Sequence, residues 1–129
     1  YTFSSKTLLK IKQKLLDSLK NKEYSTLEDL VIVAAQIIPH IASEQKRYRI
    51  SVYPDERTIR YYINEEIVDK PYEVSGSSSR FTYRHLLQIL TIKHLQAQYL
   101  PLNKIKDMRE ERMEELIINA SFPKVRPSH

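Results

Sequence analysis

The stretch "RTIRYYINEEIVDKP", residues 57–71, places two arginines and two adjacent tyrosines on consecutive helical turns and then meets a proline. Asp55 before it is a good helix N-cap, and Glu56 lies in the first turn, where the helix dipole favours a carboxylate. An apolar stripe recurs every four residues: Ile59, Ile63 and Ile67. The sequence therefore predicts a helix over about residues 56–65, with its arginines away from the isoleucine side.

Two further helices are predicted upstream. Residues 7–20, "TLLKIKQKLLDSLK", carry apolar side chains at three- and four-residue spacing: Leu8, Ile11, Leu15 and Leu19. This spacing predicts an amphipathic helix. Residues 27–38, "LEDLVIVAAQII", are apolar nearly all round, so we expect a helix in the core. A capping box of Ser25 and Glu28 would open it, and Pro39 would kink or end it.

The rest of the chain alternates between extended and helical patterns. Residues 44–53, "EQKRYRISVY", alternate polar and apolar side chains, which favours a short strand or an extended arm. Residues 72–83, "YEVSGSSSRFTY", hold Gly76 in a serine cluster and predict a β-hairpin with a flexible tip. Two helices are then predicted, over about residues 83–98 and 102–118.

Composition indicates one globular domain with an appendage. A chain of 129 residues, with 41% hydrophobic and 29% charged residues, can bury one core. We expect an amphipathic helical segment at residues 1–24, a domain at residues 25–120 and a flexible tail at residues 121–129. No apolar run approaches the roughly 20 residues of a membrane span, so we expect a soluble protein without a membrane partner.

Cysteine usage and the N-terminus bear on the compartment. The chain has no cysteine, which excludes disulfides and thiolate zinc sites. No signal peptide is visible, and both features favour the cytoplasm. The first residue is Tyr1 rather than methionine, which is typical of a piece cut from a longer chain.

Charge and motif content narrow the function classes. The formal net charge of +5 favours an anionic partner, although a modest excess of this kind also serves solubility. The four histidines show no metal-ligand spacing, and a chain with one glycine has no glycine-rich phosphate loop. No Ser-His-Asp or paired-carboxylate arrangement is visible in the sequence. We therefore expect no enzyme activity, no metal site and no cofactor.

The order of elements is that of a winged helix-turn-helix: a core helix, a connector, a basic and aromatic helix, a hairpin and two more helices. The segments "TIRYYINEEIVDKP" (58–71) and "SRFTYRHLLQILTIKHLQAQYLPLNKIK" (79–106) closely resemble the DNA-binding domain of the MerR family of transcriptional regulators. The resemblance covers about residues 54–110. It implies a mainly α-helical winged helix-turn-helix fold with a small β-hairpin wing, here preceded by an additional N-terminal amphipathic helix.

The resemblance also implies where DNA would bind. The helix of about residues 56–65 would enter the major groove, and the wing of about residues 72–82 would touch the backbone or the minor groove. The residues expected at DNA, including two further basic clusters, are Arg57, Thr58, Arg60, Tyr61, Ser79, Arg80, Arg84, Lys46, Arg47 and Arg49. Solvated surface charge is the alternative interpretation for the cations of this set other than Arg80. Tyr62 is expected in the core, because it shares the apolar side of its helix.

This sequence departs from the family pattern at two glycines. Glu66 follows the double tyrosine where the family has glycine, and Tyr99 replaces the glycine before the last helix. Both are places where a left-handed backbone is expected, so we predict that these turns differ here. The family's long dimerisation helix and effector domain have no counterpart before Pro123, so neither dimerisation nor ligand sensing is implied.

The sequence leaves three functional hypotheses. The leading one is a transcriptional regulator that binds double-stranded DNA sequence-specifically. The second is a protein-interaction module that docks on a second copy or another protein through the N-terminal helix, by Leu8, Leu15 and Leu19, and through the last helix. The third is an excisionase-like factor that uses the same surface to bend DNA.

Overall fold

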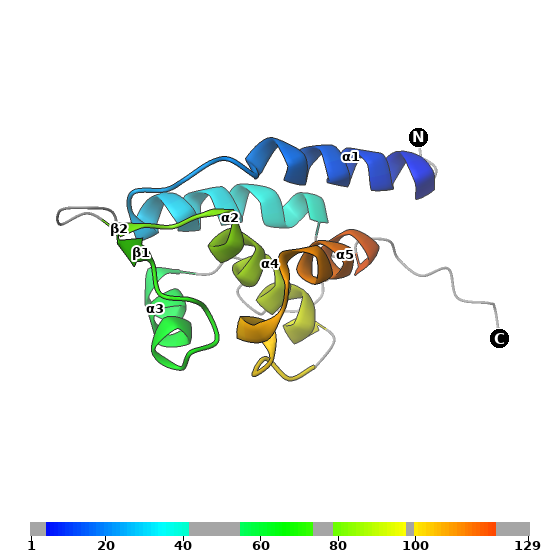
Figure 1. Cartoon of the computed structure of the whole chain (residues 1–129). Coiled ribbons are helices and arrows are strands. Elements are labelled where there is room, and N and C mark those ends of the chain that lie inside the picture. Colours follow the sequence, from blue (N-terminus) through cyan, green and yellow to red (C-terminus); the bar gives the residue numbers. More distant parts are fainter. Residues whose placement is uncertain (1–4, 42–54, 74–78, 98–99, 121–129) are drawn as a thin grey trace.

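The computed structural model describes residues 5–41, 55–73, 79–97 and 100–120, and this part of the chain is mainly α-helical (Figure 1). Its elements in order are α1 (Ser5–Leu19), α2 (Leu27–Ile41), α3 (Glu56–Asn64), β1 (Tyr72–Glu73), β2 (Ser79–Arg80), α4 (Tyr83–Ala97), the 3-10 turn η1 (Ile105–Asp107) and α5 (Glu110–Ala120). The arm and the tail predicted at residues 44–53 and 121–129 lie outside the described residues, and the predicted division at residue 24 stays a prediction.

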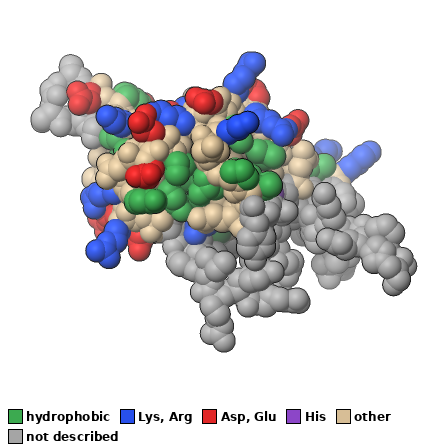
Figure 2. Space-filling model, turned by 90° about the horizontal axis from the view of Figure 1, so that it is seen from below, with side chains coloured by type: hydrophobic (Ala, Val, Ile, Leu, Met, Phe, Trp, Pro, Cys, Tyr) green, Lys and Arg blue, Asp and Glu red, His purple; other side chains and the backbone are tan. Residues whose placement is uncertain are grey.

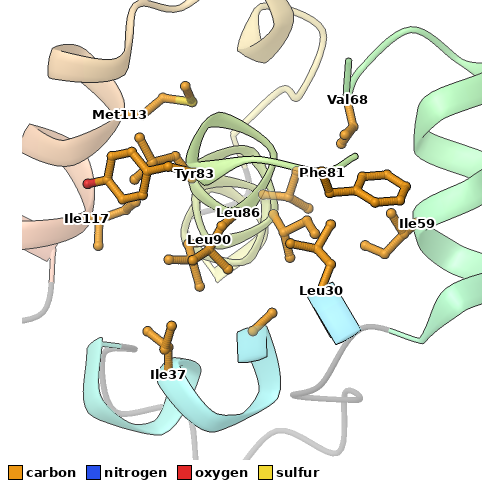
Figure 3. Close-up of a cluster of buried hydrophobic side chains, with 14 of the residues drawn as sticks. Leu30, Ile37, Ile59, Val68, Phe81, Tyr83, Leu86, Leu90, Met113 and Ile117 are labelled. Atoms are coloured by element: carbon orange, nitrogen blue, oxygen red, sulfur yellow. The ribbon is translucent and has the colours of Figure 1, made fainter. Parts of the chain in front are cut away.

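Helix α4 lies at the centre of the fold. Figure 3 shows it end-on, with α2, α3 and α5 around it and their apolar side chains turned toward it. The buried side chains labelled there include Leu86 and Leu90 of α4, Leu30 and Ile37 of α2, Ile59 of α3 and Ile117 of α5. All of them belong to one hydrophobic cluster. The burial of Ile59 in this cluster, together with the contacts of α3 with α2, therefore sets the position of α3, the helix that carries the predicted DNA contacts.

The amphipathic helix predicted near the N-terminus is present as α1, which packs against α5. Its buried side differs from the predicted one by about one residue. Leu16 and Leu19 are buried together with Lys12, whereas Ile11 is 46% exposed and Leu15 half-buried. The aliphatic stem of a lysine can cover apolar surface, which the hydrophobic pattern does not register. Burial lowers the pKa of Lys12 to about 8.

The N-cap of helix α2 lies one residue later than predicted, and the helix continues past Pro39. The Thr26 hydroxyl accepts a hydrogen bond of 3.0 Å from the amide of Asp29, so the cap is Thr26 and not Ser25. The helix runs through Pro39 to Ile41, so of the two predicted effects of Pro39, a kink or an end, the end is wrong. A proline in the last turn removes one backbone hydrogen bond, and the packing of α2 on α4 outweighs this loss.

Between α3 and α4, β1 and β2 form a short antiparallel pair. Its register is Tyr72 opposite Arg80 and Glu73 opposite Ser79. A hairpin wing beyond this two-residue pairing is not seen in the described part of the chain, because residues 74–78 lie outside it. The predicted wing is therefore described only at its base.

The turn after α3 keeps the left-handed backbone without a glycine. The amide of Ile67 donates to the carbonyl of Tyr62 at 2.9 Å, and the amide of Glu66 donates to the carbonyl of Ile63 at 3.1 Å. This is the Schellman pattern, and Glu66 adopts its left-handed position with φ 61. The prediction of a different turn is therefore wrong for Glu66. The two hydrogen bonds offset a cost of roughly 1–2 kcal/mol for a residue with a Cβ atom.

The last helix starts later than predicted. The expectation was a helix from about residue 102, but α5 begins at Glu110, after the separate turn η1. Met108 is extended, with φ −74 and ψ 141, and this conformation interrupts the helix between the two elements. Ile105 in η1 is fully buried, so the break allows this side chain to reach the core.

Candidate nucleic-acid interface

The outer face of α3 carries three of the residues predicted to touch DNA. Arg57 and Arg60 are exposed, and Tyr61 is 57% exposed. Ile59 is fully buried and Tyr62 only 8% exposed, which confirms the prediction that Tyr62 is a core residue. Residues three and four positions apart share one helix face, so the three outward side chains form one surface.

The start of α3 is fixed by its N-cap, as the sequence predicts. The amide of Thr58 donates a hydrogen bond of 2.8 Å to Asp55 Oδ1. Hydrogen bonds from Thr58 lower the pKa of the Asp55 carboxyl, so this side chain stays ionised at the positive end of the helix dipole. Thr58 itself is half-buried, and its polar groups serve this cap.

Arg60 pairs with Glu56 one turn earlier. Its Nη2 atom lies 3.2 Å from Glu56 Oε1, and the two side chains are 64% and 40% exposed. The alternative interpretation of Arg60 as part of a solvated ion pair is thus realised in this structure. Exposed pairs contribute at most about 1 kcal/mol, so Arg60 can leave Glu56 for a phosphate at low cost.

A hydrogen bond between side chains holds α3 on the central helix. Gln96 Nε2 donates to Tyr62 Oη at 2.7 Å, and burial raises the pKa of the Tyr62 hydroxyl. Tyr61 and Tyr62 also contact each other, with ring centroids 5.8 Å apart. One tyrosine of the pair therefore anchors the helix while its neighbour points outward.

Arg84 is turned inward rather than toward a DNA surface. Its Nε donates to Asp69 Oδ2 at 2.7 Å, and its Nη2 donates to the carbonyl of Lys106 at 2.7 Å. Burial works against ionisation of Asp69, but the hydrogen bond and charge of Arg84 outweigh it and lower the pKa of Asp69. Arg84 thus ties the segment after α3 and the turn η1 to α4. Sequence patterns do not predict this contact, because the partners of Arg84 lie 15 and 22 residues away.

His85 is a buried link between the segment before β1 and α4. Its Nδ1 accepts the amide hydrogen of Thr82 at 2.9 Å, so its Nε2 carries the proton and donates to the carbonyl of Lys70 at 2.9 Å. Burial lowers the pKa of His85, which favours this neutral form. His85 is therefore a buried histidine whose two ring nitrogens both have hydrogen-bond partners.

The remaining predicted contacts are only partly described. Arg80 is half-buried on β2, and no ion pair joins it to another described residue. The side chain of Ser79 and the whole of the cluster Lys46, Arg47 and Arg49 lie outside the description. Figure 2 shows the molecule from the side on which α3 lies in Figure 1. Basic and acidic side chains surround hydrophobic ones there, so this surface is mixed rather than uniformly basic.

The described residues contain neither a metal site nor a membrane-spanning helix. No group of three or more His, Cys, Asp or Glu side chains within them is arranged to hold a metal ion. None of the helices in the described ranges is long and apolar enough to cross a membrane.

Comparison with known proteins supplies the family. Residues 55–112 match the family described as MerR HTH family regulatory protein, from the cap of α3 into α5. Comparisons of the chain with curated proteins and with solved structures gave no significant match. The family is non-enzymatic, in agreement with the prediction from the sequence, and it acts by binding DNA to regulate transcription. Residues 55–112 of this chain therefore match a MerR HTH regulatory domain, the DNA-binding unit of a family of transcription regulators.

Proposed function

We propose that this protein binds double-stranded DNA sequence-specifically through the outer face of α3. The observation that carries the proposal is that α3 has an exposed basic and aromatic side and a buried apolar side. Arg57, Arg60 and Tyr61 are exposed together, while Ile59 and Tyr62 hold the helix to the core. Arginine offers a planar fork of donors for phosphate or guanine, and tyrosine offers a donor on a stiff side chain.

In the proposed binding mode α3 enters the major groove. The wing at residues 72–82, with Ser79 and Arg80, touches the backbone or the minor groove, and the cluster Lys46, Arg47 and Arg49 touches neighbouring phosphates. We assign Thr58 and Arg84 to holding this surface in place, because their hydrogen-bonding groups serve Asp55, Asp69 and the carbonyl of Lys106.

Fluorescence anisotropy with labelled duplexes tests the proposal. A tight-binding duplex is first selected from a pool of sequences, and its affinity is compared with that of an unselected duplex. If about six phosphates are contacted, the logarithm of the affinity should fall with the logarithm of salt concentration at a slope of roughly −5. The double variant Arg57→Ala, Arg60→Ala should lose the preference for the selected duplex.

A matched control removes the same charge from another surface. Arg109 and Arg112 on the α5 side are exposed, with side-chain exposures of 85% and 58%. The double variant Arg109→Ala, Arg112→Ala should retain the preference for the selected duplex. Unchanged binding by the α3 variant, or equal loss in both variants, would contradict the proposal.

The two alternative functions, protein docking and DNA bending, would use different surfaces of the molecule. Of the leucines that motivated protein docking, Leu19 is buried and Leu15 is half-buried, and the side chain of Leu8 lies outside the described residues. Helix α1 also packs against α5, so part of this side of α1 is already covered within the chain. A DNA-bending factor would use the same face of α3. Gel mobility of the complex with the duplex site moved from the end to the middle of a longer fragment separates bending from simple binding.

A further inference from the structure

The segment that joins α1 to α2 lies against the base of the wing. An isolated β-bridge pairs Tyr24 with Phe81, the residue after β2. The amide of Tyr24 donates to the carbonyl of Phe81 at 2.8 Å, and the amide of Phe81 donates back at 2.9 Å. Both side chains are buried, at 7% and 6% exposure. Tyr24 precedes the residues that match the family, so the wing base leans on a part of the chain outside that match.

Glu23, the residue before this bridge, contacts β1. The Tyr72 hydroxyl on β1 donates a hydrogen bond to the Glu23 carboxylate, and this contact raises the pKa of the tyrosine. Tyr72 lies directly opposite Arg80 in the strand pair. Opposite residues of an antiparallel pair project from the same face, with Cβ atoms about 4.5–5.5 Å apart. Tyr72, whose hydroxyl donates to Glu23, is therefore the direct cross-strand neighbour of Arg80.

We propose that Glu23 is a positioning residue for DNA binding, which acts through Tyr72 to fix the direction in which Arg80 leaves the sheet. The inference rests on the proposed function. A pairing of two residues per strand is too short to hold a hairpin by itself, so outside support decides its orientation. An arginine side chain has many rotamers, and a ring fixed beside it removes part of this freedom before DNA binds. Glu23 accepts its hydrogen bond from the Tyr72 hydroxyl, and no ion pair joins Arg80 to another described residue, so the charge of Arg80 stays available for phosphate.

A double-mutant cycle tests the inference by DNA affinity. The variant Tyr72→Phe removes the hydrogen bond without a change in charge, and Glu23→Ala removes the acceptor. Each should lower the affinity for the selected duplex about threefold, the size expected for one exposed polar contact. Arg80→Ala should lower the affinity about tenfold and reduce the salt slope by about 0.9. In the Arg80→Ala background, Tyr72→Phe and Glu23→Ala should have no further effect.

Tyr83→Phe is the matched control, because the Tyr83 hydroxyl likewise donates to a carboxylate, that of Glu114, but joins α4 to α5. It should leave the DNA affinity unchanged, and circular dichroism checks that every variant is folded. Two outcomes would overturn the inference while the duplex preference carried by α3 persists. The first is that Tyr72→Phe lowers the DNA affinity equally in the parent and in the Arg80→Ala background. The second is that Arg80→Ala does not change the DNA affinity. If the Arg57→Ala, Arg60→Ala variant kept its full preference for the selected duplex, the proposed function itself would be overturned.

Discussion

Gln96 of α4 donates a hydrogen bond of 2.7 Å to the hydroxyl of Tyr62 on α3. This contact joins the helix with the proposed DNA-reading face to the central helix of the core. Tyr62 is buried and Tyr61, its neighbour, is exposed. Two adjacent and chemically identical side chains therefore have separate tasks, and substitution can distinguish them.

Tyr62→Phe should lower the free energy of unfolding by about 1 kcal/mol, because it removes this hydrogen bond and leaves the Gln96 amide without its partner. Tyr61→Phe, the matched change on the exposed neighbour, should alter stability by less than about 0.5 kcal/mol. Urea denaturation followed by circular dichroism measures both variants. Equal stability of the two would contradict the anchoring role of Tyr62.

Glu66→Gly should stabilise the protein by about 1 kcal/mol, because glycine adopts the left-handed conformation at φ 61 without the penalty of a Cβ atom. The ion pair that Glu66 forms with Lys106 at 3.4 Å is exposed and offsets little of this gain. Glu65→Gly is the control, since Glu65 has φ −84 and gains nothing from glycine. A thermal melt in which Glu65→Gly gains as much as Glu66→Gly would refute this account of the turn.

Stability should fall as the pH drops below about 6.5, the ordinary pKa of histidine. Burial lowers the folded-state pKa of His85, so the unfolded chain takes up a proton at a higher pH than the folded one. The contribution is complete above pH 6.5 and is lost as the pH falls toward the folded-state pKa. Burial lowers the pKa of His94 in the same direction. In urea titrations between pH 8 and about pH 5, His85→Gln should show a weaker pH dependence than the parent protein.

Arg84→Ala should destabilise the fold by about 1–3 kcal/mol, because it leaves the half-buried Asp69 carboxylate without its charge-assisted partner. Arg84→Lys should restore only part of this loss, since an ammonium group cannot reproduce the two directed guanidinium bonds. Arg80→Ala, at a half-buried position on β2, should leave stability within about 0.5 kcal/mol. Stability of Arg84→Ala equal to that of the parent in urea would remove the structural role assigned to Arg84.

Arg60→Ala should cost about 1–3 kcal/mol of DNA-binding free energy and relax the preference at one base pair if Arg60 reads a guanine edge. Glu56→Gln removes the charge that pairs with Arg60, so it should leave the DNA affinity equal or slightly higher. Anisotropy titrations against duplexes with each base at every position locate the affected base pair. A uniform loss across all duplexes would show that Arg60 contacts phosphate instead.

Local sequence signals predicted α3 well. The Asp55 cap, the apolar stripe and the double tyrosine all act within a few residues, so they identified the helix, its start and the burial of Tyr62. The buried side of α1 was misplaced because Lys12 packs by its aliphatic stem, and the start of α5 because Ile105 turns into the core through a separate turn. These outcomes depend on neighbours that are distant in the sequence.

The predicted site shows the same contrast. Exposure of Arg57, Arg60 and Tyr61 follows from helix periodicity, which can be read directly from their spacing. The inward turn of Arg84 depends on Asp69 and on a backbone carbonyl of η1, and the hydroxyl of Tyr72 on β1 donates to Glu23 before α2. No periodic pattern encodes such pairs, because each joins segments that become neighbours only in the folded chain.

The buried side chains Ile59 and Tyr62 hold α3 to the core, whereas Arg57, Arg60 and Tyr61 are exposed. Substitutions at positions 57, 60 and 61 that suit a helix should therefore each change the stability of the fold by less than about 0.5 kcal/mol. A library in which all three are randomised would search new operator preferences on an unchanged scaffold.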